Sequence, residues 1–454
     1  MTLDTIAALA TTYGPGALAV IRISGPEAEN ILKAVFRPRH RHGDFFSHRL
    51  YHGDLVCPQT GKYIDEVLVC LMRGPHSYTG EDVVEIFCHG GLSVPRAVLA
   101  SVIQAGARPA ERGEFTRRAF INGRLDLTQA EAIAEVVTAQ GEKGREVALR
   151  QLKGELKSVI EGLTGRLKEC LARMEAAIDF IEDVSDKEVA KGVEAEIGKV
   201  REEIVRLAGT YRQGRLYREG AAIVILGRPN VGKSSLLNCL LGRKRAIVTP
   251  IPGTTRDFLE EMWEVKGLLV RVIDTAGIRP TEDALEEAGI QFVWEKVQEA
   301  DLILFLVDGS ERLTAIDRAI MERVAERRVL PVINKMDLPC VLEEEALAKA
   351  FSIPALRISA KYGEGIEQLT NTIYQMLVGE EEISTVAVTQ ARHLHCLERA
   401  AQALEKSLKR DVLSQTELAC EEVKEAIEAL GEITGEKVSP DVLDIIFSTF
   451  CVGK

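Results

Sequence analysis

This chain of 454 residues contains no long apolar run and no excess of basic residues, and each absence excludes a class of function. No run approaches the roughly 18 consecutive apolar residues of a membrane helix, and Asp4 stands where a signal peptide would be basic. We therefore expect a cytoplasmic protein that makes no membrane contact. The formal net charge of −12 gives no bulk attraction for nucleic acids, so any RNA contact requires local basic patches.

Paired cysteines are also absent. The nine cysteines show no C-x-x-C pair and no zinc-ligand spacing, which favours reduced thiols, most of them buried. His40, His42, His48 and His52 lie in a basic segment, and their spacing matches no metal motif. We expect these histidines to be solvated or to face RNA, and we assign them no metal.

Proline is absent from two long intervals, between Pro109 and Pro229 and between Pro354 and Pro440. Both intervals are rich in Ala, Leu, Glu, Lys and Arg, with apolar residues at helical spacing. They predict two long helical tracts on either side of a central domain. Before them, short alternating apolar runs separated by Gly- and Pro-containing turns predict an α+β module.

The most specific pattern is G-R-P-N-V-G-K-S at residues 227–234, which follows an apolar run at residues 222–226. It predicts a buried strand, a phosphate-binding loop and a helix whose N-terminus faces the bound anion. The glycines turn backbone N–H groups toward a phosphate, Lys233 reaches the outer phosphates, and the Ser234 hydroxyl can bind Mg²⁺. A tight glycine turn, the structural alternative, explains neither Lys233 nor Ser234.

Further segments, each after an apolar strand, identify the nucleotide. In D-T-A-G, the Asp274 carboxylate can hold the Mg²⁺ shell and the Gly277 N–H can meet a γ-phosphate. In N-K-M-D, Asn334 can bond a purine edge, Lys335 can lie along the ring, and Asp337 can accept two N–H bonds from guanine, a donor pair that adenine lacks. These motifs predict a GTPase domain.

The loop S-A-K, formed by Ser359, Ala360 and Lys361, is expected to bring backbone N–H groups to the guanine oxygen. The segment 247–257 contains two prolines and a glycine, which favour an irregular switch loop. Ile278 follows D-T-A-G, where Ras-type enzymes place the glutamine that orients the attacking water. Another group must therefore orient that water; the carboxylates at 279–289 are candidates, although solvated surface acids are the alternative.

We therefore predict a multidomain fold: an α+β domain, a discontinuous all-α helical domain, and an α/β P-loop GTPase domain inserted between its halves. Residues 213–220, with two glycines and three charges, are expected to form a hinge before the GTPase domain. The expected segments are 1–118 (α+β), 119–215 (first helical part), 216–378 (GTPase) and 379–454 (second helical part with the C-V-G-K tail).

The whole chain resembles the MnmE (TrmE) family of tRNA modification GTPases. The resemblance rests on V-I-R-I-S-G near the N-terminus, S-Y-T-G-E-D-V-V-E-I-F-C-H-G-G at 77–91, R-G-E-F-T-R-R-A-F-I-N-G-R-L-D-L-T-Q-A-E-A at 112–132, the GTPase motifs, P-G-T-T-R-D and the terminal C-V-G-K. It implies an enzyme that, with a flavin-dependent partner protein, adds an aminomethyl or carboxymethylaminomethyl group to C5 of the wobble uridine of certain tRNAs. It also implies a homodimer through the N-terminal domain, with transient dimerisation of the GTPase domains.

The resemblance also assigns roles to residues of the GTPase domain. A K⁺ ion, held by Asn230, Thr249, Ile251 and Thr254, would supply the positive charge of an arginine finger when two GTPase domains meet. Mg²⁺ would lie on Ser234 and Thr255, and Glu286 would orient the water that Ile278 cannot. For Glu286, an exposed acid beside Glu287 is the alternative.

The expected GTP contacts are Asn230, Val231, Gly232, Lys233, Ser234, Ser235, Thr249, Thr254, Thr255, Asp274, Gly277, Asn334, Lys335, Asp337, Ser359, Ala360 and Lys361.

A second expected site binds a tetrahydrofolate, 5-formyl or 5,10-methylene, as the one-carbon source. The resemblance places it at Arg22, Glu85, Arg124 and Lys454; at Arg124 some members carry lysine, which keeps the charge with a different geometry. A carboxylate suits the pterin N–H donors, and cations suit the glutamate tail of the folate. Each residue taken alone is equally consistent with a surface charge or an ion pair.

The C-V-G-K tail allows three interpretations. As a prenylation box it is poor, because Gly453 is not aliphatic and Lys454 is not a usual last residue. It can also be a frayed terminus. The resemblance implies instead that the apolar stretch 442–450 anchors a helix that returns the tail to the folate pocket, where Cys451 is a candidate nucleophile.

A different class of protein also fits part of the pattern. GTP-dependent ribosome-assembly factors of the Era/EngA type share P-G-T-T-R-D and the hydrophobic residue after D-T-A-G, yet perform no chemistry on RNA bases. An assembly factor that performs no chemistry on bases does not require the N-terminal module or the cysteine-containing tail, so these two features distinguish the alternatives.

Overall fold

The computed structural model describes residues 4–40, 44–179, 186–243, 260–274, 293–379, 386–410 and 415–454. The chain divides into two compact units. Unit 1 contains residues 1–134, 152–164 and 427–454, and unit 2 contains residues 135–151 and 165–426. The four segment boundaries expected from the sequence stay predictions. Among the described residues, no helix has the length and apolarity needed to cross a bilayer.

Unit 1 is built on a seven-stranded sheet of order β3-β4-β5-β6-β2-β1-β7. Neighbouring strands are antiparallel except the parallel pair β1 and β7. Helices α1 (Ala28–Val35) and α2 (Ser93–Gln104) cover one face, so alternate strand residues such as Ile21, Val69 and Ile86 are fully buried. The predicted α+β module is confirmed. The strands are β1 (Ile6–Leu9), β2 (Gly14–Ser24), β3 (Phe36–Pro38), β4 (Arg49–Val56), β5 (Tyr63–Met72), β6 (Val83–Gly91) and β7 (Arg108–Pro109).

The C-terminal segment also belongs to unit 1. Helix α16 (Pro440–Ser448) contributes Phe447 to a small core with Phe450 and Leu127. Helix α3 (Glu114–Ile121) begins at Gly113, where a Cβ would lie 2.6 Å from the carbonyl oxygen of Phe447. The apolar contacts of Phe447 and Phe450 hold the C-terminal segment within unit 1. This agrees with the anchoring role that the sequence predicts for the apolar stretch 442–450.

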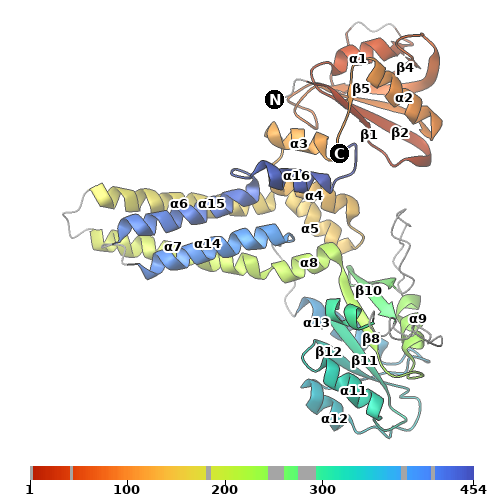
Figure 1. Cartoon of the computed structure of the whole chain (residues 1–454), viewed down its shortest axis with the longest axis vertical. Coiled ribbons are helices and arrows are strands. Elements are labelled where there is room, and N and C mark those ends of the chain that lie inside the picture. The colour runs from red at the N-terminus through yellow and green to blue at the C-terminus, as the bar shows by residue number, and fades with distance from the viewer. Residues whose placement is uncertain are drawn as a thin grey trace. The chain divides into compact units, whose positions relative to one another are not determined.

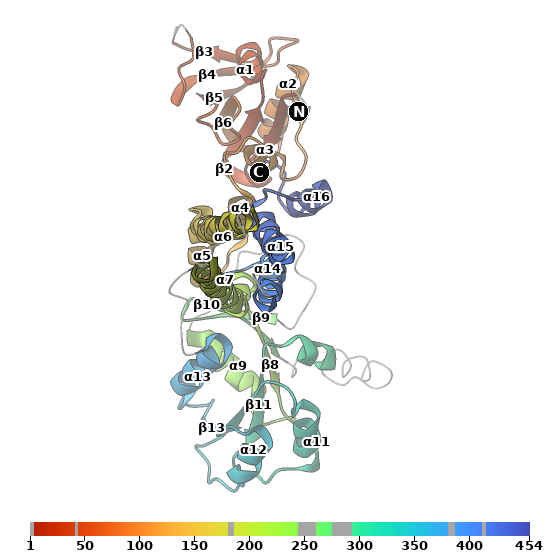
Figure 2. The ribbon, with the colours of Figure 1, turned by 90° about the vertical axis from the view of Figure 1, so that its left-hand side faces the viewer.

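Unit 2 contains a six-stranded sheet of order β13-β12-β11-β8-β10-β9, and among its described strands β9 alone is antiparallel to its neighbour. Helices α9 (Lys233–Arg243) and α13 (Ile366–Val378) cover one face, and α11 (Ala315–Val324) and α12 (Glu344–Phe351) cover the other (Figure 2). Because both faces are covered, the parallel strands are continuous apolar runs, which is why the sequence predicts them closely. They are β8 (Ala221–Leu226), β9 (Glu260–Val265), β10 (Leu268–Asp274), β11 (Leu302–Asp308), β12 (Val329–Asn334) and β13 (Leu356–Arg357).

The two helical tracts of the sequence are confirmed, and helices from both tracts pack against each other within unit 2. Helices α7 (Asp186–Gly209) and α14 (Ala391–Lys409) lie side by side, and Arg201 pairs with Glu405 at 2.9 Å between them (Figure 1). Other helices of the tracts are α4 (Leu127–Thr138), α5 (Glu142–Leu152), α6 (Glu155–Asp179), α8 (Tyr211–Glu219) and α15 (Thr416–Thr434).

One local prediction is wrong. The expected hinge at residues 213–220 is helix α8 (Tyr211–Glu219), which ends at Gly220. Leu216 and Tyr217 are buried in the core of unit 2, and a Cβ at Gly214 would lie 2.1 Å from the carbonyl oxygen of Val388. Close packing, and not flexibility, accounts for the glycine at 214.

Candidate functional site

The phosphate loop lies between β8 and α9, and its two motif glycines are required by close packing. A Cβ at Gly227 would lie 2.3 Å from the carbonyl oxygen of Leu306, and one at Gly232 would lie 2.3 Å from Nδ2 of Asn334. Gly232 also has φ +100° and Asn230 has φ +66°, conformations that turn backbone N–H groups toward one side. The loop therefore has the concave form that suits a phosphate.

Lys233 places its charge inside this loop. Its side chain is buried, and Nζ donates to the carbonyl oxygens of Gly227 at 2.8 Å and Arg228 at 3.0 Å. Ser234 and Ser235 are exposed in the first turn of α9, the positive end of the helix dipole. The Lys233 charge and the positive end of the helix dipole therefore lie at the loop where the sequence predicts the phosphates, and the exposed Ser234 hydroxyl is the predicted Mg²⁺ ligand.

The two base-recognition loops are tied to the phosphate loop by Asn334. This buried side chain donates from Nδ2 to the Val231 carbonyl oxygen at 2.8 Å and accepts at Oδ1 from the Ala360 N–H at 2.9 Å. The amide therefore links three loops, while its contact with a purine edge stays a prediction. Asp337 is exposed and accepts a 2.7 Å bond from the Ser359 hydroxyl, and its contact with guanine also stays a prediction.

Lys335 is oriented by Asp308 at the end of β11. Its Nζ lies 2.6 Å from Asp308 Oδ2, and its backbone has φ +65°. Burial alone would raise the pKa of Asp308, but the hydrogen bonds from Lys335 and Ser310 outweigh it and hold that pKa below its usual value. The carboxylate therefore stays ionised and keeps the lysine stem in place. Lys361 is exposed, with its Nζ 4.9 Å from the centre of the Tyr362 ring.

Several predicted residues of the GTPase site lie outside the described residues. Asp274 ends β10 as expected, but only its backbone is described. The K⁺ shell, the Thr255 ligand for Mg²⁺ and the water-orienting carboxylate stay predictions. The predicted residues outside the described ranges are Thr249, Ile251, Thr254, Thr255, Gly277 and Glu286.

The second predicted site comes together in unit 1. Arg22 on β2 stands opposite Glu85 on β6, and its Nη2 and Nε lie 2.8 Å and 2.9 Å from Glu85 Oε1. The guanidinium also donates to the Gly453 carbonyl oxygen at 3.3 Å and lies 4.7 Å from the centre of the Tyr78 ring. The strand register thus brings the two residues of the ion pair together, and Arg22 links the pair to the C-terminal tail.

The tail is docked, which excludes a frayed terminus. Val452 forms a β-bridge with Arg112, whose Nε donates to the Phe450 carbonyl oxygen at 3.1 Å. Gly453 is buried with φ +97°, and a Cβ there would lie 2.2 Å from the Leu9 carbonyl oxygen. Burial and the positive charge of Arg22 lower the pKa of Lys454.

Arg124, the remaining residue predicted to bind folate, lies in a hollow next to Arg22 and Glu85. It lines a hollow of about 660 Å³, and no contact between it and Arg22 or Glu85 is seen in the described structure. Tyr78 lines the same hollow and receives Arg22 over its ring, so it connects the two groups. Its hydroxyl is 2.8 Å from Thr116 Oγ1, and burial raises its pKa. The residues lining the hollow are His48, Met72, Pro75, His76, Ser77, Tyr78 and Arg124.

Two residues of this site are missed by residue-level reasoning on the sequence, Tyr78 and Gly453. Both lie inside motifs that carry the family resemblance, S-Y-T-G-E-D and C-V-G-K. These motifs were the sequence feature from which the two residues could have been assigned to the site. Cys451, between the anchored Phe450 and the docked Gly453, is exposed. The tail geometry therefore presents an accessible thiol beside Lys454.

Models of known families and full-length relatives match nearly the whole chain. Residues 5–124 match the family model of the GTP-binding protein TrmE N-terminus, and residues 127–451 match that of the MnmE helical domain. The chain is 50% identical to the tRNA modification GTPase MnmE of Syntrophus aciditrophicus over 99% of both chains. It is 44% identical to the protein of the same name from Natranaerobius thermophilus over 100% of both.

Among solved structures, Era of Aquifex aeolicus bound to GDP.AlF4- is 29% identical, covers 43% of this chain and 70% of its own, and gives a TM-score of 0.29. The full-length relatives extend through the N-terminal module and the tail, which an assembly factor without base chemistry does not need. The chain therefore belongs to the MnmE family of tRNA modification GTPases and is a GTP-hydrolysing enzyme that acts in tRNA modification.

Proposed function

We propose that this enzyme, with a flavin-dependent partner protein, adds an aminomethyl or carboxymethylaminomethyl group to C5 of the wobble uridine, using a tetrahydrofolate one-carbon unit. The observation that carries the proposal is the meeting of Arg22, Glu85 and the C-terminal tail beside a hollow that contains Arg124. Because the substrate is tRNA, we also propose that the enzyme works in the cytoplasm.

The donor set suits a reduced folate such as the 5-formyl or 5,10-methylene form. Glu85 can accept N–H bonds from a pterin, and Arg22, Arg124 and Lys454 can pair with the carboxylates of a folate tail. A hollow of about 660 Å³ has the size of a typical small-molecule site. The bound folate would supply the one-carbon unit, while Arg22 and the docked tail orient it toward the exposed Cys451.

Mass spectrometry of wobble nucleosides tests the proposed function. Transfer RNA from cells that lack this protein should contain unmodified uridine at the wobble position, and the gene supplied in trans should restore the modified nucleoside. A full complement of modified wobble uridine without the protein would contradict the proposal.

In the GTPase domain, we propose that Mg²⁺ binds at Ser234 and Thr255 and that K⁺ binds beside Asn230. The exposed first turn of α9 supports the Mg²⁺ site, because the Ser234 hydroxyl is a hard oxygen ligand beside the buried Lys233. Asn230 carries an amide oxygen at a positive-φ position of the same loop. We propose that the K⁺ site is completed when two GTPase domains dimerise transiently.

GTP hydrolysis is therefore expected to be at least about 10-fold faster in K⁺ than in Na⁺ at equal ionic strength, because the cation neutralises charge that develops on the phosphates. Asn230→Ala should remove the difference between the two salts, whereas Arg228→Ala, in the same loop, should retain it. Steady-state phosphate release measures both. Equal rates for the unmodified enzyme in the two salts would eliminate the K⁺ site.

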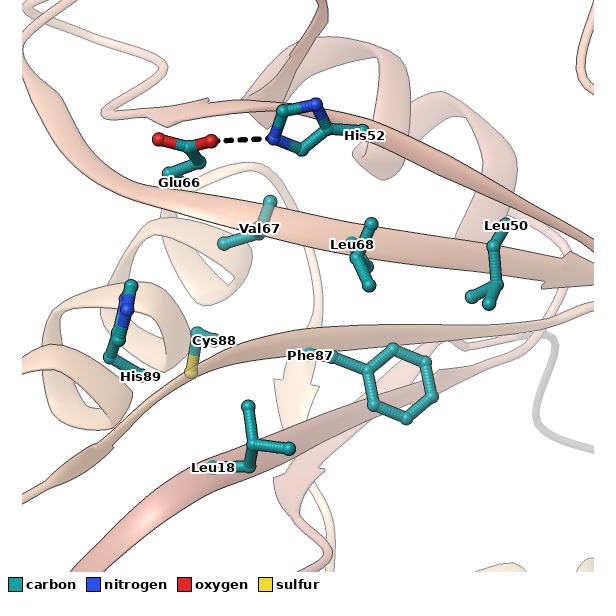
Figure 3. Close-up of a pocket in the computed structure, with 9 residues that line it drawn as sticks. All are labelled: Leu18, Leu50, His52, Glu66, Val67, Leu68, Phe87, Cys88 and His89. Carbon is teal, nitrogen blue, oxygen red and sulfur yellow. Dashed lines mark hydrogen bonds and ion pairs between the residues drawn. The ribbon is translucent and has the colours of Figure 1, made fainter.

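We also propose that two copies associate through the uncovered face of the unit 1 sheet. Leu18, Leu50 and Leu68 are 68%, 62% and 42% exposed on this face, and with Phe87 they line a hollow of about 590 Å³ (Figure 3). Charges of both signs stand at its rim, where His52 Nε2 is 2.6 Å from Glu66 and Arg39 also pairs with Glu66. An apolar centre with a mixed-charge rim suits a second copy of the same face.

Leu68→Glu is expected to weaken the dimer by roughly 10-fold or more, because a carboxylate would be buried in each copy of the interface. Ile316→Glu on α11, with a similarly exposed side chain of 57%, serves as the control and should leave the dimer intact. Sedimentation velocity of the full chain measures both. A Leu68→Glu protein that dimerises like the control would exclude this face.

A further inference from the structure

Residues 37–52 form a basic and aromatic segment, and the functions proposed above use neither its Phe46 nor its Arg49. It contains four arginines, four histidines and one aspartate, in a chain whose net charge is −12. Within its described part, Phe46 is 60% exposed, although phenylalanine is normally buried. The Arg49 guanidinium lies 5.0 Å from the centre of the Phe46 ring. The pair presents an aromatic ring and a planar cation together at the surface.

The backbone around Phe46 is held in place. The Phe46 N–H donates to the Tyr51 oxygen at 2.7 Å, and the adjacent Phe45 packs edge-on against the buried Tyr51 ring, with the ring centres 5.0 Å apart. The Ser47 hydroxyl accepts from the Arg73 N–H at 3.0 Å and is 2.8 Å from His48 Nδ1. These contacts anchor the segment on both sides of Phe46, so its exposed ring is preorganised.

His48 joins this segment to the candidate folate site. Its backbone has φ +62°, an uncommon conformation for a residue with a Cβ, and its N–H donates to the Leu71 carbonyl oxygen at 2.8 Å. With this geometry its side chain lines the hollow of about 660 Å³ that Tyr78 and Arg124 also line. The exposed Phe46 therefore stands two residues from the wall of that hollow.

We propose that Phe46 and Arg49 form a stacking platform for an unpaired base of the tRNA anticodon loop, placed to bring the wobble uridine to this hollow. The inference rests on the proposed function, because the hollow is where the one-carbon donor is placed. RNA recognition commonly stacks unstacked loop bases on aromatic rings and guanidinium planes. Arg37 and Arg49 on the same segment supply the positive charge that the phosphates of a loop require.

Binding of a fluorescein-labelled anticodon stem–loop RNA, with uridine at the wobble position, to the full-length protein tests the platform. Phe46→Ala should weaken binding by roughly 5- to 100-fold, the range for loss of one stacked base, while Phe46→Trp should retain it. Arg49→Lys keeps the charge but loses the planar stack, so it should weaken binding less than Arg49→Ala. A fully paired RNA duplex of the same length should not distinguish the Phe46 variants.

The matched control is Tyr13→Ala. Tyr13 is 53% exposed in the same unit and carries the Arg96 guanidinium 5.9 Å from its ring centre, but it does not line the hollow. This variant should bind the stem–loop like the unmodified protein. A second RNA with 2-aminopurine at the wobble position should change its fluorescence on binding, and Phe46→Ala should abolish the change. Equal stem–loop affinity of Phe46→Ala and Tyr13→Ala would overturn the platform.

Titration with 5-formyltetrahydrofolate separates this inference from the proposed function. If the wild-type protein binds the folate and Phe46→Ala does not change stem–loop affinity, the stacking platform is wrong and the proposed folate site is supported. If the protein binds no folate but stem–loop binding depends on Phe46, the platform stands and the proposed folate site is wrong.

Discussion

Replacing Cys451 by serine is expected to reduce wobble-uridine modification by at least about 100-fold while GTP hydrolysis and folate affinity stay within a few-fold. Serine is close to cysteine in size but far less nucleophilic at neutral pH, so only a chemical role of the thiol would be lost. The exposed Cys451 does not fill a core, and a packing effect is therefore not expected. Modified nucleosides are measured by mass spectrometry in a reconstituted reaction with the partner protein.

Gly453→Ala is the matched variant for a role of the tail in closing the pocket. Its new Cβ would clash with the Leu9 carbonyl oxygen at 2.2 Å, and its φ of +97° is unfavourable for alanine. It should weaken folate binding by roughly 10-fold, because Gly453 would no longer present its carbonyl to Arg22. Normal modification by Cys451→Ser, together with weak folate binding by Gly453→Ala, would leave the tail as a structural closure and reject the nucleophile.

Glu286→Ala is expected to lower the kcat of GTP hydrolysis by roughly 100-fold or more, in the range of a lost water-positioning group, with nucleotide affinity within a few-fold. The reason is chemical: Ile278 has no polar atom to orient the attacking water. Single-turnover hydrolysis separates the chemical step from binding.

Glu287→Ala supplies the control for this prediction, because it removes the neighbouring carboxylate and changes the net charge by the same amount. It should retain turnover within a few-fold. If both variants turn over at similar rates, Glu286 is a solvated acid and another group orients the water.

The GTPase fold was predictable because its signals are local. Each parallel strand, such as β8 and β11, is a continuous apolar run followed at once by polar motif residues, and a strand buried on both faces allows no other composition. The glycines of the phosphate loop were predictable from the motif spacing, although the atoms that exclude a Cβ there belong to Leu306 and Asn334, which are distant in the chain. The motifs and their order along the chain therefore predict that Lys233, Asp337 and Ser359 belong to one nucleotide site.

The second site could be placed only through family motifs, because its residues are distant in the chain. Arg22 and Gly453 are 431 residues apart, and no periodicity in either segment indicates that one bonds the other. Residue-level patterns also failed at α8, where two glycines suggested a hinge although Gly214 is needed for a close approach to Val388.

The sequence by itself determined the GTPase motifs, the helical tracts and the family, because strand burial, proline exclusion and motif spacing are properties of contiguous residues. The family motifs place Arg22, Glu85 and the tail in one pocket, but only the tertiary structure decided that Arg22 bonds Glu85 and Gly453. It also decided that Tyr78 joins them to Arg124 and that Phe46 is displayed on an anchored segment. These arrangements depend on the register of antiparallel strands and on the docking of Phe447 and Gly453, and such long-range contacts leave no local trace in the chain.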